Sequence, residues 1–145
     1  MALSCAMSRF ENVTTFRVRY SETDQMGTFY NARALEWFEC GRSEALRALG
    51  LPYTAIEARG VFLPVVEAHV VYQGRARYDD LLRMTTAVAF EGRARLRAEV
   101  RIVQAENGQP VAQGYTIHAF VEAAGNPIRP PQWLVEMVEK ANNQA

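Results

Sequence analysis

Hydrophobic and polar residues alternate along five segments of the chain, each rich in β-branched and aromatic residues, which is typical of β-strands. The predicted strands cover residues 13–20, 62–73, 81–91, 93–105 and 110–123. Asn107-Gly108 is a strong signal for a two-residue hairpin between the last two segments, and Glu91-Gly92 is a weaker hairpin signal. Short connections of this kind indicate an antiparallel sheet.

Between the first two predicted strands the period changes from two to that of a helix. A long helix is predicted from about Asn31 to Leu49, followed by Gly50 and Pro52, which end helices. At about 100° per residue its apolar positions cover roughly half of the circumference. They are Ala34, Trp37, Phe38, Gly41, Ala45, Ala48 and Leu49, widened by Leu35 and Leu46. Such a helix is expected to be partly wrapped by other structure.

A second, short helix is predicted over residues 131–142, after Pro130-Pro131. One long helix against a five-stranded antiparallel sheet defines an α+β fold. The 145 residues suit a single domain, 1–145, in which residues 1–10 are predicted to form a flexible N-terminal tail. The formal net charge is zero, so nothing in the charge balance favours nucleic acid as a partner.

The sequence predicts a cytoplasmic protein. Its apolar runs are shorter than the ~18 residues of a membrane span, and the apolar stretch 1–7 is too short for a signal peptide. Cys5 falls in the predicted tail and Cys40 in the predicted helix, so we expect no disulfide, as in a reducing compartment.

Few residues offer recognisable catalytic chemistry. The patterns typical of metal sites, phosphate loops and serine nucleophiles are absent from the sequence, so we expect neither a metal nor a cofactor. His69 and His118 lie in predicted strands and are interpreted as structural or surface residues. Glu39 and Arg42, three positions apart on the helix, are interpreted as a structural ion pair.

The remaining candidate is the polar loop of residues 21–27, Ser-Glu-Thr-Asp-Gln-Met-Gly, which leads into the long helix. Asp24 and Thr23 suit a local turn, and Gly27 permits a positive φ. A functional interpretation is more specific. A carboxylate placed before a helix N-terminus lies near free backbone N–H groups and the positive end of the helix dipole. Together they can polarise a carbonyl group and direct an attack on it.

The segment from Arg17 to Asn31, continued by Glu39-Cys-Gly-Arg-Ser-Glu44, resembles the signature of hotdog-fold acyl-CoA thioesterases. It is most similar to the 4-hydroxybenzoyl-CoA thioesterase and YbgC-type branch. The resemblance extends over nearly the whole chain, including the strand order and the single long helix. It implies the hotdog fold, in which a five-stranded antiparallel sheet wraps around one helix. It also implies hydrolysis of an acyl-CoA thioester to a carboxylate and free coenzyme A.

By this resemblance, Asp24 is the catalytic carboxylate and the backbone N–H of Asn31 polarises the thioester carbonyl. Many YbgC-type members have His at the Asn31 position, so only the backbone role carries over. Substrate-binding positions are expected in the loop and the start of the helix. They are Gly27, Phe29, Tyr30 and Trp37. Asp24 is expected to act either as a general base or as a nucleophile.

Several alternatives remain open at this point. A non-catalytic acyl-CoA-binding module would share the fold, whereas a hotdog hydratase is disfavoured because Phe29 stands where such enzymes need His. The acyl group and the carrier, coenzyme A or acyl carrier protein, are not specified. The resemblance implies a homodimer or homotetramer with sites at the dimer interface. Arginines available for the phosphates of coenzyme A are Arg75, Arg77, Arg93, Arg95 and Arg129.

Overall fold

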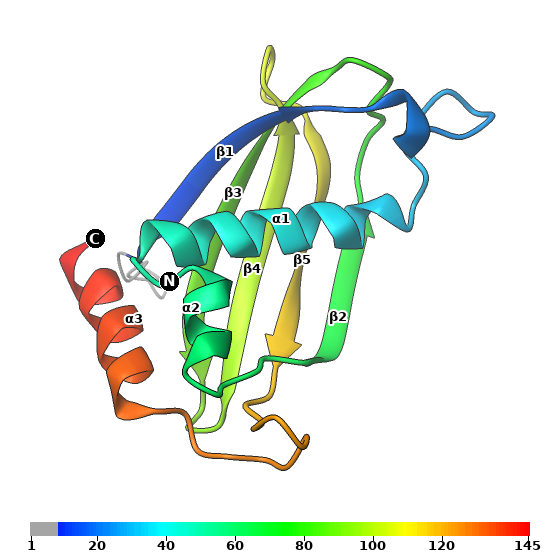
Figure 1. Cartoon of the computed structure of the whole chain (residues 1–145). Coiled ribbons are helices and arrows are strands. Elements are labelled where there is room, and N and C mark those ends of the chain that lie inside the picture. The colour runs from blue at the N-terminus through cyan, green and yellow to red at the C-terminus, as the bar shows by residue number, and fades with distance from the viewer. Residues whose placement is uncertain (1–8) are drawn as a thin grey trace, which may run out of the picture.

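A computed structural model describes residues 9–145, and Figure 1 shows one long helix lying across one face of a curved sheet. The elements in chain order are β1 (Glu11–Arg17), the 3₁₀ helix η1 (Tyr20–Glu22), α1 (Arg33–Ala48), α2 (Tyr53–Ala58), β2 (Val65–Tyr72), β3 (Leu81–Glu91), β4 (Arg95–Gln104), β5 (Pro110–His118) and α3 (Gln132–Gln144).

The sheet has the strand order β1-β3-β4-β5-β2, and each neighbouring pair is antiparallel. This confirms the predicted α+β fold with five antiparallel strands. The strands β1 and β2 form the two edges, and the first turn of α1 lies near the β2 edge (Figure 1). The hydroxyl of Tyr72, the last residue of β2, donates to the carbonyl oxygen of Asn31 at 2.8 Å.

Two glycines bring α1 close to the sheet. A Cβ at Gly41 would lie 2.5 Å from Oγ1 of Thr86 in β3, so the helix can approach this strand only without a side chain there. In β5, a Cβ at Gly114 would meet the ring of Phe38 at 3.1 Å and the backbone of β2. The ring of Phe38 is fully buried against the sheet as a result. Full burial of a side chain of this size contributes about 1.5–3 kcal/mol.

The predicted apolar face of α1 is largely confirmed, with corrections at its margins. Six of its positions are buried: Ala34, Trp37, Phe38, Gly41, Ala45 and Leu46. Leu35 and Ala48 are exposed and Leu49 is half-buried, so the buried face is narrower than the sequence predicted. The sheet therefore covers the helix from one side; Leu49 packs at the margin of the core, whereas Leu35 and Ala48 are exposed.

Strand bounds differ from prediction where backbone pairing ends. The first strand spans 11–17 rather than 13–20, because the chain turns into η1 after Arg19. The last strand ends at His118 rather than at residue 123, since the chain leaves the ladder and makes isolated bridges at Val121. The second strand begins at Val65, directly after Pro64.

Both predicted hairpins exist, but their loops are longer than two residues. Glu91 pairs with Arg95 across a three-residue loop. The second loop spans residues 105–108 because the N–H of Gln104 donates to the carbonyl oxygen of Gln109. Gly108 has φ 74° there, so the glycine supplies a positive φ at the end of a longer loop rather than in a two-residue turn.

The helix α2 was not predicted, because six residues with one buried side chain, Ile56, give no readable period. It packs with α3 and the second half of α1 in a second part of the core, which includes Leu46, Phe120 and Leu134. Residues 1–8 of the predicted tail lie outside the described residues. The end of that tail is anchored, since Phe10 donates its N–H to Oδ1 of Asn142 at 3.0 Å.

Across residues 9–145, none of the helices is long and apolar enough to cross a bilayer.

Candidate functional site

The loop that carries Asp24 is a small antiparallel turn held at three points. Thr23 and Phe29 form an isolated β-bridge, the N–H of Asp24 donates to the carbonyl oxygen of Thr28 at 2.9 Å, and the N–H of Tyr30 donates to that of Glu22 at 2.8 Å. These bonds place Asp24 on one arm of the turn and the residues leading into α1 on the other. Figure 1 shows the turn projecting from the body of the molecule beyond the start of α1.

The geometry at the tip of the turn fixes the Asp24 side chain. Its Oδ1 accepts the N–H of Met26 at 2.8 Å, and its carbonyl oxygen accepts the N–H of Gly27 at 3.0 Å. Gly27 has φ 77°, the left-handed conformation that the sequence predicted for it. Asp24 is half-buried, and within residues 9–145 its Oδ2 has no hydrogen-bond partner. One carboxylate oxygen is therefore available for chemistry while the other holds the turn.

The start of α1 offers unpaired backbone donors. The N–H groups of Arg33 and Ala34 close a first turn onto the carbonyl oxygens of Tyr30 and Asn31, at 2.9 and 3.3 Å. The N–H groups of Asn31 and Ala32 have no acceptor within the part of the chain that the structure describes. The sequence predicted that the helix begins at about Asn31, but the regular helix begins at Arg33, because this first turn is tighter than an α-turn. The donors remain at the positive end of the helix dipole.

The return arm of the turn is tied to the connection between β2 and β3. The N–H of Phe29 donates to the carbonyl oxygen of Ala76 at 2.8 Å, and Oγ1 of Thr28 accepts the N–H of Ala76 at 3.1 Å. Exposed Arg75 and Arg77 flank this residue, so they are near the Asp24 turn. Arg93 and Arg95 lie at the opposite end of β3, in the hairpin to β4. The structure thus separates the arginines that the sequence grouped together.

The four predicted substrate positions divide into exposed and buried residues. Gly27 is exposed and Tyr30 is 50% exposed, whereas Phe29 and Trp37 are buried. The ring centroids of Phe29 and Trp37 are 4.8 Å apart, and those of Phe16 and Trp37 are 5.1 Å apart. These buried rings support the turn and the first part of α1. Their role in substrate binding stays a prediction.

Glu22 is a residue that the sequence analysis missed. It is 4% exposed, and its carboxylate accepts two short hydrogen bonds, from the backbone N–H of Arg19 and from Nε1–H of Trp37, both at 2.7 Å. Burial alone would raise the pKa of Glu22, but these bonds and the Arg19 guanidinium at 3.4 Å hold it below its usual range. The sequence feature that could have identified Glu22 is its position three residues after Arg19, a spacing that suits capping of a short helix.

The predicted ion pair between Glu39 and Arg42 is wrong. The Arg42 guanidinium turns toward the sheet and donates to Oγ1 of Thr116 at 3.3 Å, while Glu39 is exposed. Oγ1 of Thr116 lies 2.8 Å from Nε2 of buried His118, whose Nδ1 lies 3.0 Å from the carbonyl oxygen of Leu63. Because a carbonyl only accepts, Nδ1 carries the proton and Nε2 accepts from Thr116. His118 thus has the structural role that the sequence predicted.

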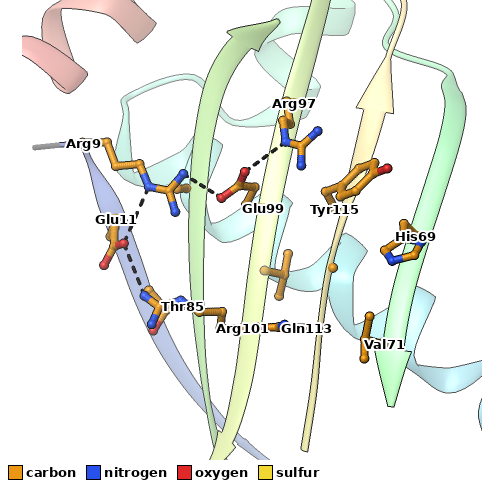
Figure 2. A pocket seen from close by; sticks show the side chains of 13 residues that line it. Arg9, Glu11, His69, Val71, Thr85, Arg97, Glu99, Arg101, Gln113 and Tyr115 are labelled. Carbon is orange, nitrogen blue, oxygen red and sulfur yellow. Dashed lines mark hydrogen bonds and ion pairs between the residues drawn. The ribbon is translucent and has the colours of Figure 1, made fainter. Parts of the chain in front are cut away.

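A separate polar depression of about 280 Å³ lies on the sheet face opposite α1 (Figure 2). Its charges are paired: Glu99 contacts Arg9 at 2.6 Å and Arg97 at 3.0 Å. The Arg97 guanidinium also lies 3.8 Å from the ring centroid of Tyr115. Because residues of the Asp24 turn do not line it, this depression is distinct from the candidate site.

Comparison with known proteins agrees with this fold and turn. The model of the thioesterase-like superfamily matches residues 18–138, a range that includes the Asp24 turn, α1 and every strand after β1. The chain therefore belongs to the thioesterase-like superfamily, which confirms the resemblance found in its sequence.

Two relatives and one solved structure show how similar this chain is to known proteins in sequence and in fold. YneP of Bacillus subtilis (strain 168) is 43% identical over 63 residues, which cover 43% of this chain and 46% of YneP, less than two thirds of that relative. The acyl-CoA thioester hydrolase YbgC of Escherichia coli O6:H1 is 35% identical over 100 residues, 66% of this chain and 75% of YbgC. The crystal structure of a hypothetical protein from Thermus thermophilus superposes with TM-score 0.84 at 32% identity, covering 91% of this chain and 98% of that one.

Proposed function

We propose that this protein is an acyl-CoA thioesterase, which hydrolyses an acyl-CoA to a carboxylate and free coenzyme A with Asp24 as its catalytic carboxylate. One observation carries the assignment of the site. The turn that holds the Asp24 carboxylate is hydrogen-bonded, through Tyr30 and Glu22, to the start of α1, where the N–H groups of Asn31 and Ala32 have no acceptor among residues 9–145. A carboxylate beside free donors is the arrangement that attack on a carbonyl requires.

Two routes are compatible with this geometry. In the first, the oxygen of a water molecule adds to the thioester carbonyl carbon while its proton passes to Asp24, and the adduct then expels the sulfur of coenzyme A, which takes up a proton. In the second, an oxygen of Asp24 adds to the carbon, coenzyme A leaves, and water hydrolyses the mixed anhydride. In both routes the backbone donors at the start of α1 stabilise the negative charge on the carbonyl oxygen.

We propose further that two copies of the chain assemble through β2. This edge strand is exposed along almost its whole length, and its apolar side chains Val65, Val66, Val71 and Tyr72 are 39–51% exposed. An unpaired edge with apolar residues on both sides favours pairing with another strand. Because Tyr72 bonds to Asn31, a partner at this edge lies beside the start of α1, and the substrate site is completed there.

The activity is tested with a panel of aryl, short aliphatic and long aliphatic acyl-CoAs, in which release of coenzyme A is followed with a thiol-reactive dye. Because the chain has two cysteines, of which Cys40 is exposed, a blank with protein alone is needed, and release must exceed two equivalents per chain. We expect turnover with at least one class. Saturable binding of acyl-CoA without turnover across the panel would instead identify a binding module. Acyl-pantetheine and acyl carrier protein substrates then determine which carrier the enzyme prefers.

A further inference from the structure

We propose that Glu22 is a positioning residue that fixes the Asp24 turn relative to the start of α1. The inference rests on the proposed role of Asp24, and it adds a residue that acts through the turn rather than on the substrate.

The contacts of Glu22 join three separate segments. Its Oε1 accepts the N–H of Arg19, at the end of the chain leaving β1, and its Oε2 accepts Nε1–H of Trp37, one turn into α1. Its backbone carbonyl oxygen accepts the N–H of Tyr30 on the return arm of the turn. Glu22 therefore holds together the outgoing arm, which carries Asp24, the return arm, which leads into α1, and the helix α1 itself.

Backbone contacts join the arm that carries Asp24 to the return arm, through the bridge between Thr23 and Phe29 and the bond from the N–H of Asp24 to the carbonyl oxygen of Thr28, and the return arm is bonded to Ala76. The hydroxyl of Thr23 donates to the carbonyl oxygen of Tyr20, which is a local contact. The buried link from Glu22 to Trp37 is thus the side-chain contact that ties the arm carrying Asp24 to the helix, among residues 9–145. When this link is lost, the fold can persist while the carboxylate and the helix donors lose their alignment.

The ionised form of Glu22 is what the surroundings select. All three neighbouring groups donate hydrogen bonds: a backbone N–H, an indole N–H and a guanidinium. A carboxylate has two acceptor oxygens and no donor, so it satisfies this set. A glutamine keeps the shape but turns an amide NH₂ toward a donor, which leaves a buried polar group without a partner.

The test compares Glu22→Gln with Glu44→Gln, the same chemical change at an exposed position on α1. Both residues line a pocket of about 400 Å³ between β1 and α1. We expect Glu22→Gln to lower kcat by about 10- to 100-fold with KM unchanged, since misalignment by about 1 Å costs rates of this order. Glu44→Gln should turn over like the wild type. Amide hydrogen exchange should become faster in residues 23–30 of Glu22→Gln and stay unchanged in the hairpin between β3 and β4.

Two further variants separate positioning from loss of stability. Val138→Ala opens a cavity in the second part of the core, away from the turn, and should lower Tm while leaving kcat unchanged. Trp37→Phe keeps an aromatic ring but removes the indole N–H donor, and it should reproduce the kcat loss and the faster exchange. It therefore serves as the test in place of Glu22→Gln when Glu22→Gln folds poorly. In the double variant the two losses should not add, because they break one contact.

Unchanged exchange in residues 23–30 of Glu22→Gln, or a kcat loss matched by Val138→Ala at equal loss of Tm, would overturn the proposal. Failure of the proposed function is visible separately. If Asp24→Asn retains full turnover, the catalytic assignment is wrong, and exchange in residues 23–30 still decides whether Glu22 holds the turn.

Discussion

At the scale of single residues, the fold gives two nearby carboxylates opposite surroundings. Glu22 is buried with three donors around it, whereas Asp24 keeps one oxygen for the turn and one without a partner in the described chain. Glu22 ends the 3₁₀ helix η1 and Asp24 begins the turn. The two residues do not share a strand, so their spacing of two positions does not place their side chains on the same face. The sequence pointed to Asp24 through its motif, but the partners of Glu22 come from residues that only tertiary structure brings close.

The buried His118 yields a prediction about pH. Burial and the nearby Arg42 guanidinium lower the pKa of His118, while the bond to the Leu63 carbonyl opposes this shift. A histidine whose pKa is lower in the folded state contributes stability that is present above the unfolded pKa of about 6.5 and is lost as pH falls through the folded pKa. Thermal stability should therefore decrease as the pH falls below this value.

Nuclear magnetic resonance checks this directly. In a His69→Gln background, the ring resonances of His118 should titrate with a midpoint below the ordinary histidine value, and Tm should decline over the same pH range. A midpoint at or above the ordinary value would contradict the buried, neutral state of this ring.

At the scale of elements, the helix and the strands with clear periods were predicted well, and the short elements were not. The strand β3 has the predicted bounds, and the buried face of α1 follows the predicted period. By contrast, α2 and η1 are too short to show a period, and pairing with a partner strand decides where β1 and β5 end. Hairpin positions were readable from glycine, but their lengths depend on the register between strands.

The first turn of α1 carries a second prediction, which separates the backbone of Asn31 from its side chain. The N–H of Asn31 has no partner among residues 9–145, so Asn31→Pro breaks no described backbone hydrogen bond, and proline is tolerated in a first helical turn. If this N–H is an oxyanion donor, Asn31→Pro should lose about 2.7–4 kcal/mol of transition-state stabilisation, whereas Asn31→Ala keeps the donor and most of the activity.

Circular dichroism must first show that both variants are folded, and kcat/KM then gives the answer. Equal turnover of Asn31→Pro and wild type would mean that the carbonyl is polarised elsewhere. Equal loss in Asn31→Ala and Asn31→Pro would assign the role to the side chain.

At the scale of the whole molecule, the sheet has two edge strands, β1 and β2, and the first turn of α1 lies near the β2 edge. The strand β2 ends at Tyr72, which bonds to Asn31, whereas β1 forms the opposite edge. The sequence implied an assembly through its resemblance to a family of oligomers. It could not indicate which edge strand forms the contact between copies, because strand order is set by long-range pairing.

This difference gives a prediction with a matched control. Val71 on β2 and Val13 on β1 are exposed by 39% and 55%, and neither belongs to the buried core. In sedimentation experiments the wild type should be a dimer or tetramer. Val71→Glu should dissociate it and lower activity, since like charges repel across a paired edge. Val13→Glu should remain assembled and active. Dissociation by Val13→Glu alone would place the interface at β1 instead.

The central claim is that the Asp24 carboxylate performs the chemistry, and kcat of Asp24→Asn measures this most directly. Asparagine retains the Oδ1 that accepts the N–H of Met26, so the turn should survive while the charge is lost. Asp79→Asn is the matched control, because it removes the same charge from an exposed residue with φ 70°, which asparagine tolerates. The account predicts that Asp24→Asn lowers kcat by at least about 100-fold with an unchanged circular dichroism spectrum, while Asp79→Asn stays active. Turnover of folded Asp24→Asn at the wild-type rate would contradict it.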